Sequence, residues 1–254
     1  MTAPPFDRFD LTGTVALVTG GSRGLGKEIV LAFAAAGADV VIASRKLENC
    51  EAVAERVRDE TGRDALAHAC HLGRWDEIPG LVDAAYGRFG RVDVLVNNAG
   101  MSPVYDRTTD VTEAMYDSVL NLNLKGPFRL TALVGTRMAE GAGGSIINVS
   151  STGSLRPTAH IIPYAAAKAG LNAMTEGFAK AFGPTVRVNT LMAGPYLTDI
   201  SQAWDLDAVN KGVQAHALRR VGDPHEIVGA ALFLASDASS FTTGTIVRSD
   251  GGIP

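Results

Sequence analysis

Short apolar segments and longer helical segments alternate along almost the whole chain of 254 residues. The short segments are rich in β-branched residues, and strands are expected at Val15–Thr19, Val40–Ala43, Ala65–Cys70, Val92–Val96, Ser145–Ser150, Thr185–Leu191 and Thr245–Val247. Helices are expected between them, at Gly24–Ala36, Leu47–Thr61, Trp75–Phe89, Thr112–Glu140, Tyr164–Phe182 and Pro224–Leu234. Strands that are joined in turn by helices predict a mostly parallel sheet with helices on both faces.

No Pro/Ser-rich linker, charge block or internal repeat divides the sequence, so residues 1–254 are expected to form one domain. The predicted fold class is α/β: a single doubly wound domain of the Rossmann type with a seven-stranded sheet. Gly126-Pro127 predicts a bend in the longest helix. The segment at about 195–221 has mixed polarity and no periodicity, and we expect it to be a mobile substrate lid.

Composition argues against several other classes of protein. Hydrophobic residues make up 46% of the chain, which is enough for a large core and too many for a disordered chain. A net charge of −4 argues against nucleic acid as a partner. The most apolar stretch, Ile29–Ala43, contains Gly37 and Asp39 and is too short to span a membrane, and the N-terminus does not resemble a signal peptide. Only Cys50 and Cys70 are cysteines, which indicates a reducing compartment and a cytoplasmic protein.

A glycine-rich turn, Thr19–Gly26, joins the first expected strand to the first expected helix. Glycines at such a place permit a tight turn and let the backbone approach a pyrophosphate at the positive end of a helix. The spacing is G-x-x-x-G-x-G and not G-x-G-x-x-G, and an ordinary turn is the alternative. Its position after the first strand of an alternating pattern favours a dinucleotide site.

Five sequence motifs occur in order and in suitable elements. They are T-G-x-x-x-G-x-G, N-N-A-G, an asparagine within a helix, a serine thirteen residues before a tyrosine, and Y-x-x-x-K, found at Thr19–Gly26, Asn97–Gly100, Asn123, Ser151 and Tyr164–Lys168. With these motifs the sequence resembles the short-chain dehydrogenase/reductase family from about Leu11 to Gly252, although Y-x-x-x-K alone often occurs by chance. The resemblance implies a nicotinamide cofactor and a small-molecule carbonyl or alcohol substrate.

Tyr164 and Lys168 are four residues apart on an expected helix, so their side chains lie on one face. We expect the nearby ammonium, together with an oxidised nicotinamide, to lower the pKa of Tyr164. Tyr164 then exchanges a proton with the substrate oxygen, and Ser151 stabilises the charge on that oxygen through a hydrogen bond. The resemblance implies that Lys168 also binds the nicotinamide ribose and that Asn123 positions a water in a proton relay.

Neighbouring residues of the same type are alternatives at two of these positions. Ser150 and Ser154 compete with Ser151, which the thirteen-residue spacing favours. Asn121 competes with Asn123 and lies nearly on the opposite side of the expected helix.

The end of the second expected strand faces the adenosine ribose in folds of this kind. An acidic residue there would accept hydrogen bonds from the 2′-hydroxyl of NAD(H), but the sequence has Ser44 and Arg45, and Asp39 comes too early. Arg45 and Arg23 can converge on a 2′-phosphate, with Ser44 as a further donor. We therefore predict NADP(H) over NAD(H); the alternative is that both arginines are ordinary solvated residues.

The resemblance implies further cofactor contacts. His71 falls where the family usually has an adenine-binding Asp, and it either meets the adenine edge or points to solvent. Thr198 falls in a segment similar to the family's P-G-x-x-x-T, and it either donates to the nicotinamide amide or caps a helix. The cofactor-binding residues expected are Gly20, Ser22, Arg23, Gly24, Leu25, Gly26, Ser44, Arg45, His71, Leu72, Asn98, Ala99, Gly100, Tyr164, Lys168, Gly194, Leu197 and Thr198.

The five histidines lack metal-ligand spacing, and there is no G-x-S-x-G nucleophile elbow, so neither a metal site nor an esterase is expected. We expect an NADP(H)-dependent oxidoreductase that interconverts a ketone or aldehyde and an alcohol by hydride transfer. The alternative is a catalytically silent nucleotide-binding sensor or scaffold of the same fold. The resemblance also implies a homotetramer that uses the helices at Thr112–Glu140 and Tyr164–Phe182 and the C-terminal strand region.

Overall fold

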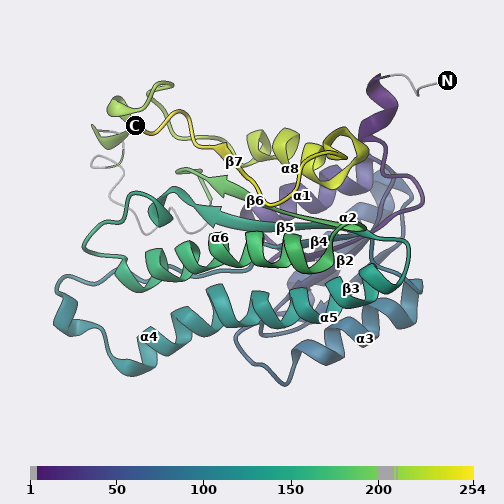
Figure 1. Cartoon of the computed structure of the whole chain (residues 1–254), viewed down its shortest axis with the longest axis horizontal. Helices are drawn as coiled ribbons and strands as arrows, with labels where there is room; N and C mark the ends of the chain where they lie inside the picture. The colour runs from purple at the N-terminus through teal and green to yellow at the C-terminus, as the bar shows by residue number, and fades with distance from the viewer. Residues whose placement is uncertain (1–4, 199–208, 210) are drawn as a thin grey trace.

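The computed structural model describes residues 5–198, 209 and 211–254, and within them seven strands form one sheet (Figure 1). The strands are β1 (Val15–Thr19), β2 (Asp39–Ser44), β3 (Ala65–Ala69), β4 (Val94–Asn97), β5 (Gly144–Ser151), β6 (Val186–Ala193) and β7 (Ile246–Ser249). Their order is β3-β2-β1-β4-β5-β6-β7, and every neighbouring pair is parallel. The predicted doubly wound α/β fold is confirmed.

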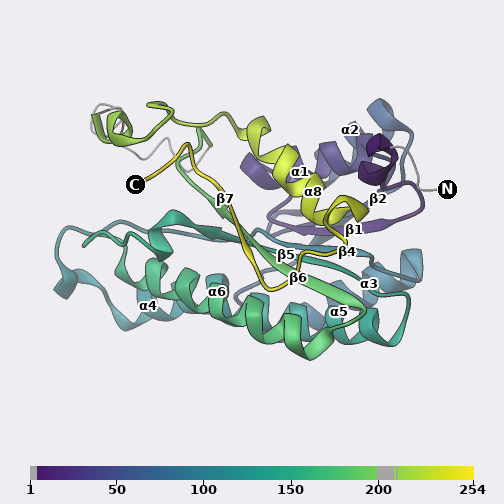
Figure 2. The ribbon, with the colours of Figure 1, turned by 45° about the horizontal axis from the view of Figure 1, so that its top comes forward.

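Helices cover both faces of the sheet, as Figure 2 shows. On one face lie α1 (Gly24–Ala35), α2 (Leu47–Thr61) and α8 (Val228–Ala235). On the other face lie α3 (Ile78–Phe89), α4 (Glu113–Leu120), α5 (Gly126–Glu140) and α6 (Ile162–Phe182). Short 3₁₀ helices are η1 (Pro5–Phe9), η2 (Thr108–Asp110), η4 (Thr152–Ser154), η6 (Val213–Ala215), η7 (Pro224–Ile227) and η8 (Asp237–Ser239).

The period of two along each strand divides the apolar residues between two cores. In β1, Ala16 and Val18 pack toward α1, α2 and α8, whereas Val15 and Leu17 pack toward α3 and α5. All four residues are nearly inaccessible to solvent. A strand that is buried on both faces has a continuous apolar sequence, which is why β1 could be predicted from the sequence.

The expected single helix at Thr112–Glu140 is in fact two α-helices joined by a π-helical turn, η3 (Asn121–Lys125). The irregular turn lies just before Gly126-Pro127, where the bend was predicted. A Cβ on Gly126 would lie 2.0 Å from the Leu72 carbonyl oxygen, so glycine lets the start of α5 pass the loop after β3. The helix predicted from Trp75 begins later, at Ile78, because residues 74–77 form turns.

The strand order reverses between β1 and β4, because the chain runs outward from β1 to β3 and then returns to the other side of β1. Ligands of doubly wound folds bind beyond the carboxyl ends of the strands at such a switch point. Residues 199–208 and 210 of the expected lid lie outside the described residues, and the lid stays a prediction. None of the helices in the described part of the chain is long and apolar enough to cross a membrane.

Candidate dinucleotide and catalytic site

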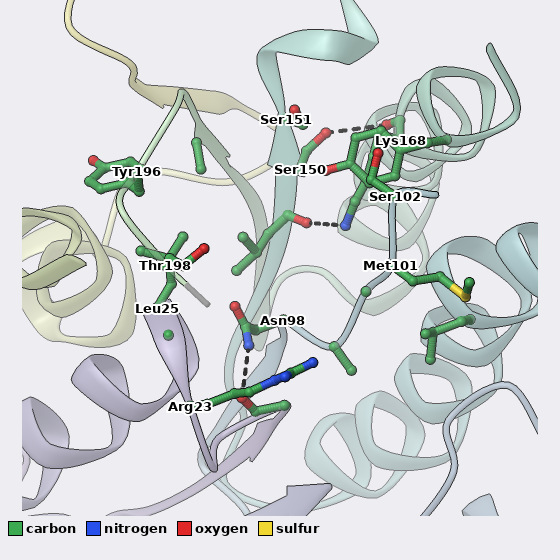
Figure 3. A pocket seen from close by; sticks show the side chains of 18 of the residues that line it. Arg23, Leu25, Asn98, Met101, Ser102, Ser150, Ser151, Lys168, Tyr196 and Thr198 are labelled. Atoms are coloured by element: carbon green, nitrogen blue, oxygen red, sulfur yellow. Dashed lines mark hydrogen bonds between the residues drawn. The ribbon is translucent and has the colours of Figure 1, made fainter. Parts of the chain in front are cut away.

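A cavity of about 1090 Å³ opens at the carboxyl ends of the strands. It brings together most of the residues singled out from the sequence (Figure 3). Those on its wall are Gly20, Ser22, Arg23, Gly24, Leu25, Ser44, Arg45, His71, Leu72, Asn98, Ala99, Gly100, Ser151, Tyr164, Lys168, Gly194 and Thr198. Three others, Gly26, Asn123 and Leu197, do not line it.

The glycine-rich loop is attached to the end of β4 by Asn98. Its Nδ2 donates to the carbonyl oxygens of Thr19, at 2.9 Å, and Gly20, at 3.3 Å. Gly20 has a φ of +66°, a conformation that favours glycine. A Cβ on Gly26 would lie 2.3 Å from the Gly20 oxygen and 2.4 Å from Asn98 Nδ2. Gly26 therefore serves the packing of the loop, and its expected contact with the cofactor stays a prediction.

The N-terminus of α1 opens toward the cavity and has no side-chain cap. Its first backbone N–H groups, together with the helix dipole, favour an anion such as a pyrophosphate. Gly24 and Thr198 lie close together at this end of the cavity, since a Cβ on Gly24 would lie 3.4 Å from Thr198 Cβ. These features fit the phosphates of a dinucleotide.

All charged side chains on the described cavity wall are basic: Arg23, Arg45, Lys46, Arg156 and Lys168. Its three arginines, Arg23, Arg45 and Arg156, form no ion pair with the side chain of any described Asp or Glu. By contrast, nine arginines elsewhere form ion pairs with carboxylates: Arg56, Arg63, Arg74, Arg88, Arg91, Arg107, Arg137, Arg220 and Arg248. The cavity is thus a positive site in a protein of net charge −4.

His71 lies on the wall between β3 and α3. Its Nδ1 accepts a hydrogen bond from Gly73 N at 3.1 Å, and its backbone N–H donates to Glu77 Oε2 at 2.7 Å. A neutral ring that accepts at Nδ1 carries its proton on Nε2. At the expected adenine position the chain therefore offers an N–H donor where the family usually has an acceptor.

Ser151, at the end of β5, and Tyr164, in the first turn of α6, are joined by a side-chain hydrogen bond. Gly153 N donates to Ser151 Oγ at 3.1 Å and so holds the hydroxyl in place. Burial raises the pKa of Tyr164, and the bond to Ser151 opposes this increase. Desolvation is thus the largest effect in the protein alone, and the lowering expected from Lys168 together with an oxidised nicotinamide stays a prediction.

The neighbouring serines have other partners. Ser150 Oγ donates to the Lys168 carbonyl oxygen at 3.3 Å, and Ser154 Oγ donates to the Ser151 carbonyl oxygen at 2.6 Å. Of the three, Ser151 alone bonds to the Tyr164 side chain in the described structure, which agrees with the thirteen-residue spacing.

Lys168 is only 4% exposed and lies one helical turn from Tyr164 on α6. Its Nζ donates to the Val149 carbonyl oxygen at 2.7 Å and lies 5.8 Å from the centroid of the Tyr164 ring (Figure 3). Burial lowers the pKa of Lys168 to about 8. Among the described residues the ammonium has one hydrogen-bond acceptor, the Val149 carbonyl oxygen, and its remaining N–H groups suit a second role as donors to ligand hydroxyls.

Asn123 lies within the π-helical turn and is fully buried behind the cavity wall. Its Nδ2 donates to the carbonyl oxygens of Met101, at 2.9 Å, and Val119, at 3.0 Å, and its Oδ1 accepts from Met101 N at 3.3 Å. These bonds attach the loop after β4 to the helix. A Cβ on Gly100 would lie 2.7 Å from Asn123 Oδ1, so the loop requires glycine at that contact.

The end of the cavity beyond Tyr164 includes residues that sequence reasoning missed. They come from the loop after β4, from η4 and the loop that follows it, and from the start of the β6 loop: Met101, Ser102, Pro103, Val104, Thr152, Gly153, Arg156, Thr158, Ile161 and Pro195. Tyr196 also lines the cavity and bonds through its hydroxyl to Ser249 Oγ at 2.6 Å. The N-N-A-G motif directly precedes the loop after β4, and Ser151 directly precedes η4. Their positions next to these motifs could have identified the lining residues of both segments from the sequence.

A doubly wound sheet, an open helix N-terminus and a half-buried tyrosine beside a buried lysine in one cavity define a nicotinamide-dependent oxidoreductase. A family model described as Enoyl-(Acyl carrier protein) reductase matches residues 20–254. An uncharacterized oxidoreductase of Mycobacterium tuberculosis is 40% identical over 97% of this chain and 94% of its own. The chain belongs to the short-chain dehydrogenase/reductase family.

Two solved structures of relatives show the same fold with different cofactors. The first is a gluconate 5-dehydrogenase from Burkholderia cenocepacia in complex with NADP and tartrate; it has a TM-score of 0.92 and 32% identity, covering 98% of each chain. The second is a 7α-hydroxysteroid dehydrogenase complexed with NADH and 7-oxo glycochenodeoxycholic acid. Its TM-score is 0.93, with 32% identity over 98% of this chain and 97% of its own. Relatives of similar identity thus bind either nicotinamide cofactor.

Proposed function

We propose that this protein is an NADP(H)-dependent oxidoreductase that interconverts a ketone or aldehyde and an alcohol, with Tyr164 as the general acid/base. The observation that carries the proposal is the hydrogen bond between Ser151 and Tyr164, with the Lys168 ammonium 5.8 Å from the centroid of the Tyr164 ring, on the wall of one cavity. The site can hold a dinucleotide whose nicotinamide would exchange a hydride with the substrate carbon. The relatives named above are oxidoreductases as well.

In this proposal Tyr164 and Ser151 carry out the proton transfer to and from the substrate oxygen. For carbonyl reduction, Tyr164 donates the phenol proton to the substrate oxygen while Ser151 hydrogen-bonds the same oxygen. The raised pKa of Tyr164 keeps the phenol protonated at neutral pH, which suits the donor role. For alcohol oxidation the phenolate is required, and the positive charges of Lys168 and an oxidised cofactor favour that form.

Lys168 and Asn123 support this proton transfer. The Lys168 ammonium has one protein acceptor, Val149 O, which leaves two N–H groups for ribose hydroxyls. Asn123 holds Met101 beside the cavity through two hydrogen bonds. Its Oδ1 keeps one lone pair for the relay water that the family resemblance implies.

The NADP(H) preference rests on charge at the end of β2. Arg45 and Lys46 follow this strand, Arg23 lies at the adjacent glycine loop, and neither arginine side chain pairs with a described carboxylate. Arginines suit a 2′-phosphate because the guanidinium forms charge-assisted hydrogen bonds with phosphate oxygens. Steady-state kinetics with both cofactors test this preference, and a higher kcat/KM with NADH would refute it.

The Tyr164→Phe variant separates an enzyme from a silent nucleotide-binding scaffold. Turnover should fall by about a hundredfold or more, since removing a general acid/base typically costs 10²–10⁴-fold, while NADPH still binds. The fluorescence of bound NADPH reports the binding, and its absorbance reports the turnover of a panel of carbonyl compounds. Full activity in the variant would remove Tyr164 from its proposed role.

We further propose a homotetramer in the cytoplasm. Three aromatic rings pack in a row over the loop before α3, α5 and α6, with Trp75 stacked on Phe128 and Phe128 packed against Phe178. Phe128 is 44% exposed while the other two are half-buried, and exposed aromatic side chains are enriched at protein interfaces. The two cysteines are free, which agrees with a reducing compartment. Sedimentation velocity measures the assembly, and a purely monomeric species would refute the tetramer.

A further inference from the structure

We propose that Tyr105 is a positioning residue of the oxidoreductase site, which fixes the first turn of α6, and with it Tyr164, against the loop after β4. The inference rests on the proposed function and adds to it a residue that does not itself line the cavity. It is drawn from the burial of Tyr105 and from two hydrogen bonds that tie it to the start of α6.

The loop after β4 forms one wall of the cavity beyond Tyr164. Residues Met101–Val104 line the cavity, whereas Tyr105, the next residue, does not and is only 7% exposed. Asn123 holds the beginning of this segment through the backbone N–H and carbonyl groups of Met101. Tyr105 is placed to hold its other end.

The Tyr105 hydroxyl accepts a hydrogen bond from the first residue of α6. The donor is the backbone N–H of Ile162, at 2.8 Å from the phenol oxygen. The first N–H groups of an α-helix have no acceptor within the helix, and the N-cap residue Ile161 supplies no side-chain acceptor. Pro163, the next residue, has no N–H group. The phenol oxygen of Tyr105 therefore takes the place of an N-cap side chain for α6.

A second hydrogen bond joins Tyr105 to the segment that leads into α6. His160 Nδ1 donates to the Tyr105 carbonyl oxygen at 3.0 Å, since a carbonyl oxygen can only accept. The same segment contributes Thr158 and Ile161 to the cavity wall. Tyr105 thus connects two parts of the wall, although 55 residues separate it from His160 in the sequence.

These contacts bear on Tyr164, because it lies two residues after Ile162 in the first turn of α6. The hydrogen bond between Ser151 and Tyr164 requires that this turn keeps its position. A displacement of about 1 Å at a reacting group can reduce the rate about a hundredfold. Neither described hydrogen bond of Tyr105 reaches the glycine loop or the end of β2. Loss of the hydroxyl should therefore impair turnover and leave cofactor binding intact.

The test compares the wild type with Tyr105→Phe, which removes only the hydroxyl group. Tyr116→Phe is the matched control, since Tyr116 is 48% exposed on α4 and does not line the cavity. Fluorescence measures the Kd of NADPH, and absorbance measures kcat and KM for whichever of cyclohexanone, acetophenone, benzaldehyde and ethyl acetoacetate the wild type reduces fastest. Mass spectrometry measures hydrogen exchange of the segment 160–166 in the protein without ligands.

In Tyr105→Phe the kcat should fall at least about tenfold, KM should change less than kcat, and the Kd of NADPH should stay within about twofold of the wild-type value. The segment 160–166 should exchange about fivefold faster, because the Ile162 N–H loses its acceptor. Tyr116→Phe should match the wild type in every measurement.

A kcat within about twofold of the wild type, which a role confined to stability predicts, would overturn the inference. So would unchanged exchange of the segment 160–166, or a loss of NADPH affinity in proportion to the loss of turnover. Failure of the proposed function appears separately, as absent NADPH binding or absent turnover of all four compounds by the wild type. The exchange measurement then decides alone: faster exchange in Tyr105→Phe supports the placement of Tyr105 at the start of α6, and unchanged exchange overturns it.

Discussion

Replacing Gly26 by alanine tests whether the glycine loop is held by packing against Asn98. The new Cβ would lie 2.3 Å from the Gly20 carbonyl oxygen and 2.4 Å from Asn98 Nδ2. Ordinary contacts of carbon lie at about 3.5–4.0 Å, so the loop or the amide must move by more than about 1 Å. Either movement breaks the hydrogen bonds from Asn98 to Thr19 and Gly20.

The expected cost follows from three contributions. Overpacking costs about 1–3 kcal/mol, and the loss of two hydrogen bonds costs about 1 kcal/mol each. The higher helix propensity of alanine returns about 1 kcal/mol, because Gly26 lies in the first turn of α1. The free energy of unfolding should therefore fall by about 2–4 kcal/mol, which corresponds to a decrease in Tm of about 5–15 °C.

Gly87→Ala is the matched control, because Gly87 lies within α3 and a Cβ there would meet nothing within 4 Å. This variant should be more stable than the wild type by about 0.5–1 kcal/mol. Urea unfolding measures both variants, and NADPH fluorescence should show a Kd at least about tenfold higher for Gly26→Ala only. If Gly26→Ala matched the wild type in stability and cofactor affinity, the packing argument would be refuted.

Three further predictions concern buried polar groups. Burial lowers the pKa of Lys168 to about 8, so between about pH 8 and 10 the unfolded chain binds more protons than the folded protein. The stability of the wild type relative to Lys168→Met should then increase by about 2 kcal/mol from pH 8 to 10, and parallel unfolding curves would contradict this. In Ser151→Ala the pKa of Tyr164 rises further, so the pH–rate profile of alcohol oxidation should move to higher pH; an unshifted profile would count against the hydrogen bond. Asn148→Val removes the bonds of Asn148 to Asn97 Nδ2 and Thr175 Oγ1, and urea unfolding should show a loss of about 2–4 kcal/mol; a change below about 0.5 kcal/mol would refute this.

The sheet and its helices could be predicted because they follow from local patterns. A strand such as β1 is buried on both faces, and its apolar run marks it directly. Gly62 and Gly90 follow the last residues of α2 and α3 and adopt the left-handed conformation that favours glycine. The C-terminal ends of these two helices could therefore also be predicted from the sequence. The motifs gave the candidate catalytic residues because their spacing matches one helical turn or one loop.

The remaining features depend on parts of the chain that meet only in the folded protein. The π-helical turn is visible only once Asn123 is bound to Met101, twenty-two residues earlier. The raised pKa of Tyr164 results from burial, which spacing does not report.

The exclusively basic charge of the described cavity wall has a kinetic consequence. The protein as a whole carries a net charge of −4, so it repels anions at long range and attracts them only near the mouth of the cavity. At an ionic strength of about 0.15 M the Debye length is about 8 Å, which screens the distant acidic surface while the concave basic wall still acts on a ligand at its entrance. Capture of a multiply charged anion is therefore governed by the local field of the site, and moderate salt should reduce the long-range repulsion before it weakens the attraction.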